Sequence, residues 1–189
     1  MAVNLSGMKD FKKFGPFAYT AKLRNGLFRN TGACLSPQNA FYNSIGMETL
    51  GLRMERVCDN AKTLAQFFAT EYSDIEVNYP GLAGSKWHNI ATEQFGDKFG
   101  GIITIRTGNK KRAFGIIDAL KLPLIVSNIG DTKTLVIHPE STLNVHSTQE
   151  EKETAGVFDD LIRISVGIED IEDLIDDFKQ AIESVKDVY

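Results

Sequence analysis

A chain of 189 residues with 42% hydrophobic residues can bury one ordinary core, so we expect one compact domain with at most a short arm. Its 21 Lys and Arg residues against 25 Asp and Glu give a formal net charge of −4, which argues against a phosphate backbone, and therefore nucleic acid, as a partner. No apolar run approaches the roughly 20 residues of a membrane-spanning helix, so we expect a soluble, cytoplasmic protein with no membrane partner.

The N-terminal end of the chain is predicted to stand apart from the main domain. Residues 1–10 carry no periodic signal and are expected to form a loose arm, whereas residues 16–30 contain helix formers with spaced apolar positions and end near Gly32. We therefore divide the chain into an N-terminal arm with a connecting helix, residues 1–33, and a domain over residues 34–189.

A longer helical pattern opens the domain. Ser36 is a candidate N-cap, and Pro37 stands at the first helical position, where its missing N–H costs nothing. Apolar residues then recur at i, i+3, i+4 and i+7 as far as about Phe68. Because Gly46 and Gly51 interrupt this run, a bend is expected.

Short β-branched segments alternate with further helical patterns in the rest of the chain. The predicted strands, each bounded by glycine, proline or a polar loop, lie within residues 75–81, 100–108, 122–131, 132–139 and 161–166. Interleaved strands and helices predict the fold class, an α/β or two-layer α+β domain. It has a small mixed or antiparallel sheet of four or five strands, with helices on one face.

Three helices are predicted between and after these strands. Residues 111–121 favour a helix by their length and their alanines. Thr148 and Glu151 fit a capping box that opens a short helix ending at Gly156. An amphipathic helix is predicted from about Glu169 onward.

Arg163 is a charged residue inside an otherwise aliphatic strand. Side chains alternate along a strand, so Arg163 lies on the face opposite Ile162 and Ile164 and need not enter the apolar layer. Its planar guanidinium matches a carboxylate or a phosphate in two parallel hydrogen bonds. On the residues alone an internal ion pair is an equally good interpretation, and Glu169 and Asp170 are candidate partners for it.

Other polar segments carry weaker signals. Residues 126–131 place small, polar and glycine residues after a strand end, where free backbone N–H groups often meet ligands, although an ordinary turn is the commoner outcome. Nothing local would depress the pKa of Lys133, so we expect a solvated lysine. The basic residues of 108–112 are predicted to form a hairpin or loop, and Trp87 and His88 to pack or lie in a loop.

Cysteines and histidines indicate neither a disulfide framework nor a metal site. Cys34 and Cys58 are far apart in the sequence and form no Cys-x-x-Cys pair, and the three histidines lack helical metal-site spacing, so free thiols and no structural metal are expected. His138 is interpreted as a structural residue at a strand end. No nucleophile–base pairing, carboxylate dyad or Gly-rich phosphate loop stands out.

Five long motifs give the chain a family resemblance. In order, they resemble the C-terminal part of the Cys/Met-metabolism family of pyridoxal-phosphate enzymes, over nearly all of the chain after about residue 16. The motifs are residues 35–68, 77–82, 99–105, 127–142 and 155–182. Within the family the chain is most similar to O-acetylhomoserine sulfhydrylases, which carry Gly-Asp-x-Lys, as in residues 130–133, where cystathionine synthases and lyases more often carry Gly-Gly-x-Glu.

The resemblance implies a role for each candidate site residue. Family members have a large N-terminal domain that holds pyridoxal 5'-phosphate and a smaller C-terminal domain, which residues 34–189 match. Arg163 then corresponds to the arginine that grips the substrate α-carboxylate, and Ser127 and Asn128 lie on the loop beside it. The Schiff-base lysine lies upstream of the matched region, so we expect no catalytic residue, no bound cofactor and no activity in this chain alone.

The implied function is γ-replacement of acetate by sulfide or a thiol on O-acetyl-L-homoserine, with the missing cofactor domain and further copies of the chain as partners. Two alternatives stay open: a free-standing, non-catalytic binding module, or part of a cystathionine γ-synthase or methionine γ-lyase type of enzyme. The chain departs from the sulfhydrylases at Leu143 and Asn144, where they carry Thr-His, and His146 is the nearest histidine. The helix starting at Pro37 is expected to expose an apolar patch and to promote self-association.

Overall fold

The structure is a computed structural model that describes residues 9–185. Its contacts divide the chain into two compact units, Met1–Glu48 and Thr49–Tyr189, which are described separately. The sequence places the boundary after residue 33, whereas the contacts place it after Glu48, so that the helix starting at Pro37 groups with the N-terminal unit.

From residue 9 to residue 48 the N-terminal unit is mostly helical. A turn at Gly15, with φ of 52°, interrupts its first segment, and Gly32, with φ of 63°, ends the continuous helical stretch that the sequence predicts over residues 16–30. Residues 1–8 of the predicted loose arm lie outside the described residues. The segments are η1 (Lys9–Phe17), α1 (Ala18–Leu23), the π-helical η2 (Arg24–Phe28), α2 (Arg29–Thr31) and α3 (Pro37–Glu48).

Helix α3 begins as predicted but buries none of its residues. The Asn39 backbone N–H donates to Ser36 Oγ over 3.1 Å, which caps the helix ahead of Pro37. Large apolar side chains on α3 are 47–68% exposed, namely Phe41, Tyr42, Ile45 and Met47. The expected apolar patch on this helix is therefore confirmed.

We expect this patch to make the chain self-associate, because exposed aromatic and aliphatic surface is removed from water when copies pair. Light scattering should give an average mass above 20.9 kDa, rising with concentration. Replacing Phe41 and Ile45 together with Ser should lower that mass toward the monomer, whereas Asn43→Ser on the same helix should not. A wild-type chain that stays at 20.9 kDa at all concentrations contradicts the expectation.

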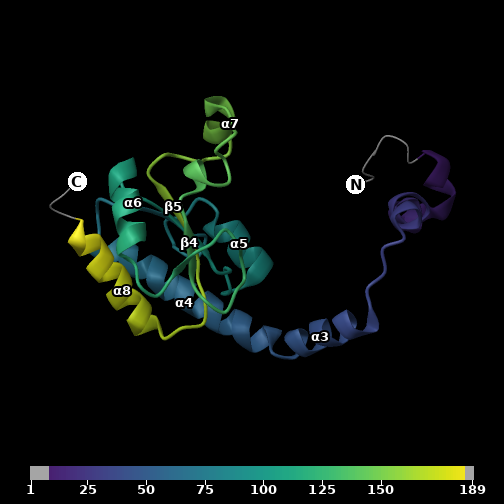
Figure 1. Cartoon of the computed structure of the whole chain (residues 1–189), viewed down its shortest axis with the longest axis horizontal. Coiled ribbons are helices and arrows are strands. Elements are labelled where there is room, and N and C mark those ends of the chain that lie inside the picture. The colour runs from purple at the N-terminus through teal and green to yellow at the C-terminus, as the bar shows by residue number, and fades with distance from the viewer. Residues whose placement is uncertain (1–8, 186–189) are drawn as a thin grey trace. The chain divides into compact units, whose positions relative to one another are not determined.

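The second unit contains a five-stranded sheet with strand order β1-β2-β5-β4-β3. Neighbouring strands are antiparallel except β3 and β4, which are parallel, so the predicted small mixed sheet of an α/β, fold-type I domain is confirmed. The elements, several of which are labelled in Figure 1, are α4 (Leu50–Glu71), β1 (Glu76–Asn78), α5 (His88–Phe95), β2 (Ile102–Arg106), α6 (Lys110–Ala119), β3 (Leu124–Ile125), β4 (Leu135–Ile137), η3 (Pro139–Ser141), α7 (Gln149–Thr154), β5 (Leu161–Ser165) and α8 (Ile171–Ser184).

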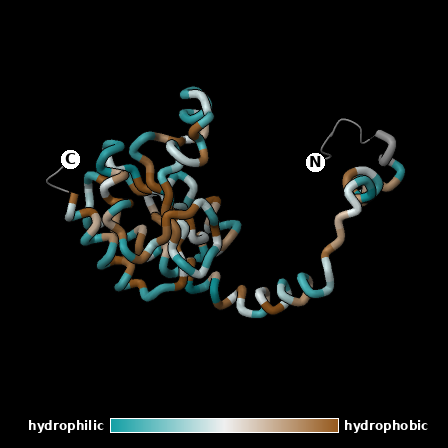
Figure 2. The backbone as a smooth tube through the Cα atoms, in the orientation of Figure 1, coloured by the Kyte–Doolittle hydropathy of each residue, from teal (hydrophilic) through white to brown (hydrophobic). Residues whose placement is uncertain are grey.

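The core lies between the sheet and the helices α4, α6 and α8. Ile162 and Ile164 of β5 face this layer and are completely buried. Phe68 of α4 and Phe178 of α8 meet edge to face with ring centroids 5.2 Å apart, which joins the two helices over the sheet. The apolar segments gather where the strands meet the helices (Figure 2). Because the helices occupy one face of β5, its alternate side chains project from the other face.

Two helices differ from the prediction. The helical pattern expected to run on to Phe68 with a bend is instead two helices, since α3 ends at Glu48 and α4 starts at Leu50 after Thr49, which has φ of −104° and ψ of 6°. Helix α5 was not predicted: Trp87 and His88, expected to pack or to lie in a loop, stand at its start. The His88 ring does pack, stacking on Phe99 with ring centroids 5.4 Å apart. Only Ala91 of α5 is buried, so the helix has no apolar stripe to reveal it.

The basic residues of 108–112 also differ from the prediction. Asn109 Oδ1 accepts a hydrogen bond from the Arg112 backbone N–H over 2.9 Å and so caps α6, which begins at Lys110. These basic side chains therefore lie in the first turn of a helix, not in a hairpin or loop.

Several local predictions are confirmed. Thr148 and Glu151 form the predicted capping box of α7, with bonds of 3.3 and 2.8 Å. His138 is buried at the end of β4 and bonds to Ser141 Oγ and the Asp159 carbonyl, as expected of a structural residue. Both cysteines are free. Among residues 9–185, no helix is long and apolar enough to cross a bilayer.

A candidate carboxylate-binding site

Arg163 lies in the middle of the central strand, β5, on the face that the helices leave open. It pairs in register with Thr104 of β2 and Ile137 of β4, so both neighbouring strands hold its backbone. Its sequence neighbours Ile162 and Ile164 enter the core, which directs the Arg163 side chain to the opposite face as predicted.

The Arg163 guanidinium is half-buried and only partly satisfied. Its Nη2 donates to the main-chain carbonyl of Ser127 over 2.6 Å and to that of Asn128 over 3.4 Å. Its Nε is buried and has no hydrogen-bond partner among residues 9–185. Burial lowers the pKa of Arg163, and no carboxylate in the described part of the chain offsets this effect. A cation partly removed from water, with a donor unused, is a site for an anion.

Arg163 does not form the internal ion pair with Glu169 or Asp170 that the sequence left open. Glu169 accepts from the backbone N–H and the hydroxyl of Thr134, over 2.5 and 2.9 Å. Asp170 accepts from the Glu172 backbone N–H at the start of α8 and lies 3.8 Å from Arg56 Nη2. Both acidic residues proposed as partners are therefore engaged elsewhere, and Arg163 keeps its capacity for an external carboxylate.

Arg106 lies on the same open face as Arg163, but its guanidinium is bonded within the protein. This residue of β2 donates from Nε to Asp160 Oδ1 over 2.9 Å, and its Nη1 lies 3.4 Å from Glu76 Oε2. Its guanidinium carbon also lies 4.0 Å from the centre of the Phe158 ring. The hydrogen bond to Asp160 raises the pKa of Arg106. Arg106 is therefore bonded to acidic residues of the same domain, whereas Arg163 retains a donor without a partner among the residues that the structure describes.

The loop of residues 126–133 brings Ser127 and Asn128 to Arg163. Its side chains are exposed, and it meets Arg163 through the main-chain carbonyls of Ser127 and Asn128. Gly130 adopts φ of 82°, and its N–H donates to Ser165 Oγ over 3.2 Å. A hydrogen bond from the Lys133 backbone N–H lowers the pKa of Asp131. Lys133 is exposed, as predicted.

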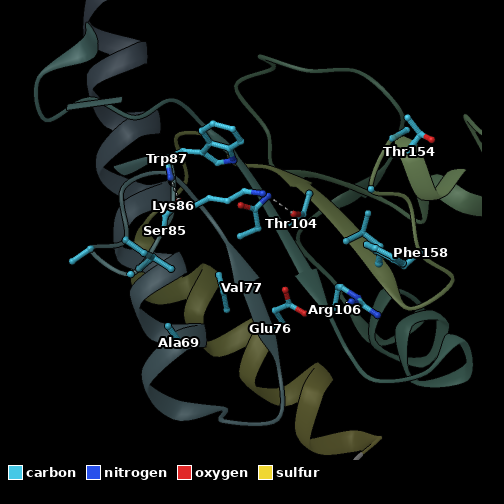
Figure 3. Close-up of a pocket in the computed structure, with 17 residues that line it drawn as sticks. Ala69, Glu76, Val77, Ser85, Lys86, Trp87, Thr104, Arg106, Thr154 and Phe158 are labelled. Carbon is cyan, nitrogen blue, oxygen red and sulfur yellow. Dashed lines mark hydrogen bonds and ion pairs between the residues drawn. The ribbon is translucent and has the colours of Figure 1, made fainter. Parts of the chain in front are cut away.

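A broad groove of about 1070 Å³ lies over the open face of the sheet and was not predicted. Figure 3 shows Arg106 beside Phe158 on one side of it and Trp87 with Lys86 on another. Thr104, which is paired with Arg163 in the sheet, also lines the groove. The sequence signal for it is Arg106, which alternates with the buried Ile103 and Ile105; the pairing of β2 with β5 places it on the same face as Arg163.

Comparison with known proteins identifies the family. Residues 9–183 match the family described as Cys/Met metabolism PLP-dependent enzyme. The chain belongs to this family.

Its curated relatives include enzymes of more than one reaction type. O-acetyl-L-homoserine sulfhydrylase 1 of Thermus thermophilus is 38% identical over 93% of this chain and 42% of its own length. L-methionine gamma-lyase of Fusobacterium nucleatum subsp. polymorphum is 41% identical over 85% of this chain and 40% of its own length. A sulfhydrylase of Fusarium oxysporum is 37% identical over 94% of this chain and 41% of its own length. The chain thus spans about two fifths of the curated relatives it matches.

Solved structures agree with this family assignment. A crystal structure described as an O-acetylhomoserine (thiol)-lyase of Campylobacter jejuni superposes with a TM-score of 0.81 at 38% identity, covering 89% of this chain and 40% of that chain. An O-acetylhomoserine sulfhydrylase of Wolinella succinogenes superposes with a TM-score of 0.75 at 36% identity, covering 94% of this chain and 48% of that chain. The Campylobacter structure contains a pyridoxyl-lysine phosphate.

The described residues offer a donor for an anion but no buried lysine for covalent attachment of the family's cofactor. The unused Arg163 Nε is a donor for a carboxylate. A lysine that condenses with an aldehyde is usually activated by burial, whereas every lysine side chain between residues 13 and 185 is exposed or half-buried. Among the described residues, Arg163 therefore offers a donor to an anionic ligand, and no lysine from residue 13 to 185 has the burial expected of a Schiff-base lysine.

Proposed function

We propose that the chain is the C-terminal, substrate-carboxylate-binding part of a PLP-dependent O-acetylhomoserine sulfhydrylase, with residues 34–189 as its functional domain. The observation that carries this proposal is Arg163, whose guanidinium is half-buried, has a free Nε and lacks an acidic partner. Membership of a family of Cys/Met-metabolism enzymes supports the α-carboxylate of an amino acid as the matching anion.

In this proposal the chain binds and orients the substrate. Arg163 donates to the α-carboxylate of O-acetyl-L-homoserine from Nε and from a terminal nitrogen of the guanidinium. The Ser127 and Asn128 carbonyls accept from Nη2 and so fix the plane of the guanidinium. Fixing the carboxylate limits rotation of the substrate and presents its Cα–H bond in one direction. The cofactor, held by a polypeptide segment other than residues 34–189, supplies the electron sink for the chemistry.

The remaining partners follow from the same proposal. The site is complete only when a cofactor-binding segment faces Arg163, and the exposed apolar face of α3 supports assembly with further copies of the chain. A cytoplasmic location fits the free thiols Cys34 and Cys58. The chain alone is proposed to be inactive.

A second candidate is methionine γ-lyase chemistry, in which a thiol is eliminated from L-methionine. The observation favouring it is the 41% identity to the Fusobacterium enzyme over 85% of this chain. Both reactions need the same carboxylate contact, so Arg163 serves either one. The residues Gly130 to Lys133, in the sulfhydrylase pattern, favour the first candidate.

Reconstitution tests the proposed function. The chain is combined with pyridoxal phosphate and the cofactor-binding portion of the Thermus sulfhydrylase, each component alone serving as control. We expect sulfide-dependent release of acetate from O-acetyl-L-homoserine only in the mixture, with slower or no thiol release from L-methionine. Faster thiol release than acetate release would favour the second candidate. A folded complex that retains the cofactor's visible absorbance but acts on neither substrate counts against both and favours a non-catalytic binding module.

A further inference from the structure

The carbonyls that contact Arg163 belong to a loop with few other attachments. Within residues 126–133 every side chain is exposed, so side-chain packing does not fix the loop. Two hydrogen bonds join it to the segment that follows Arg163: Gly130 N–H to Ser165 Oγ over 3.2 Å, and Ile168 N–H to the Thr132 carbonyl over 2.9 Å. The position of the loop therefore depends on its two ends, which are the pairing of β3 with β4 before residue 126 and Thr134 after residue 133.

Glu169 holds the end at Thr134. Its two carboxylate oxygens accept from the Thr134 backbone N–H and the Thr134 hydroxyl, over 2.5 and 2.9 Å, and Thr134 is completely buried. The same hydroxyl accepts from the Gly167 N–H over 2.9 Å. We call this set, Thr134, Gly167 and Glu169, the latch. Hydrogen bonds to a carboxylate are stronger than those between neutral groups.

The latch is itself fixed to helix α4. Asn60 Nδ2, which is buried, donates to the carbonyls of Gly167 and Glu169 over 3.1 and 2.9 Å. Arg56 Nη2 donates to the Glu169 carbonyl over 3.2 Å. The Glu169 backbone is therefore held against α4, so that the carboxylate, which bonds to Thr134, can define where the loop ends.

This geometry connects the latch to the guanidinium. Arg163 and the latch lie on the same continuous segment, from β5 to the start of α8, and the loop spans from one to the other. When the loop moves, the Ser127 and Asn128 carbonyls move with it, and they determine the plane in which Arg163 presents its free Nε. A bidentate carboxylate contact depends on that plane.

We propose that Glu169 is a positioning residue of the carboxylate site: by holding Thr134 it fixes the loop carbonyls that orient the Arg163 guanidinium. This inference rests on the proposed role of Arg163, but the orientation can be measured without a substrate or a cofactor.

The test follows the Arg163 Nε–Hε signal by NMR in the full 189-residue chain, with the signal assigned through Arg163→Lys. L-norleucine is the carboxylate probe, and its methyl ester, which lacks the carboxylate, is the control ligand. In Glu169→Gln the signal should shift before any ligand is added, and the norleucine midpoint should rise roughly threefold to tenfold, as expected for a weakened hydrogen-bond network.

Matched variants separate positioning from general stability. Glu151→Gln removes another carboxylate that accepts a backbone N–H, in the capping box of α7, and should leave the Arg163 signal unchanged. Thr134→Ser keeps both latch bonds and should behave like wild type, whereas Thr134→Val loses the hydroxyl and should reproduce Glu169→Gln. Thr134→Val also serves as the test if Glu169→Gln does not fold.

Two results are decisive. A folded Glu169→Gln or Thr134→Val chain with an unchanged Arg163 signal and an unchanged norleucine midpoint overturns the positioning role. If the wild-type signal does not respond to norleucine, the carboxylate function of Arg163 fails instead, and the ligand-free signal alone decides whether Glu169 positions the guanidinium.

Discussion

Arg163→Ala is expected to lower kcat/KM for O-acetyl-L-homoserine in the reconstituted enzyme by about 30-fold to 1000-fold, equivalent to about 2–4 kcal/mol of transition-state binding. The variant removes the one guanidinium on the open sheet face that has an unused buried donor among the described residues. Steady-state kinetics over a range of substrate concentrations measure the loss. Arg163→Lys keeps the charge but not the planar pair of donors, so an intermediate loss is expected.

Arg106→Ala is the matched control for this prediction. Arg106 is an arginine on the neighbouring strand and the same face, but its donors are bonded to Asp160 and Glu76. Its loss leaves the buried Asp160 carboxylate with fewer partners, so stability should fall by about 1–3 kcal/mol while substrate binding is kept. If Arg163→Ala stays within twofold of wild type in kcat/KM, or Arg106→Ala loses as much as Arg163→Ala, the carboxylate assignment is wrong.

Local chemistry made part of this structure predictable. The alternation along β5 placed Arg163 on the open face because its aliphatic neighbours Ile162 and Ile164 must enter the core. The capping box of Thr148 and Glu151 marked the start of α7 because its hydrogen bonds span only three residues. By contrast, α5 was missed because only Ala91 of that helix is buried, which leaves no periodic apolar pattern.

The details of the site were less predictable because they depend on distant contacts. Sequence alone left Glu169 as a candidate partner of Arg163, but its carboxylate bonds to Thr134, 35 residues away. The Arg163 guanidinium is instead met by the carbonyl of Ser127, 36 residues away. No local pattern reports such pairings, since main-chain carbonyls occur at every position. Sequence therefore indicated which residues gather at the site but not which atoms meet.

Close backbone approach at the latch leads to the other large expected effect. Gly167 is buried, and a Cβ added to it would lie 2.5 Å from the Thr132 carbonyl oxygen and 2.6 Å from the Lys133 carbonyl carbon. Both are backbone atoms, so no rotation of a side chain can relieve the contact. The segment that carries Glu169 and the loop that contacts Arg163 can pack at this distance only with glycine at position 167.

Gly167→Ala is therefore expected to lower the free energy of unfolding by about 3 kcal/mol, measured by urea denaturation, and to displace the Arg163 Nε–Hε signal. The control is Gly84→Ala, where an added Cβ meets no atom within 4 Å and φ is not positive, so a change within about 0.5 kcal/mol and an unmoved Arg163 signal are expected. Loss of stability without displacement of that signal would mean that the tight contact serves folding alone. Displacement in both variants would mean that the signal reports general loosening rather than the latch. If the Arg163 signal is displaced in Gly167→Ala but not in Gly84→Ala, the packing at residue 167 controls the orientation of the guanidinium. The loop accounts for this connection, since it lies between the latch and Arg163.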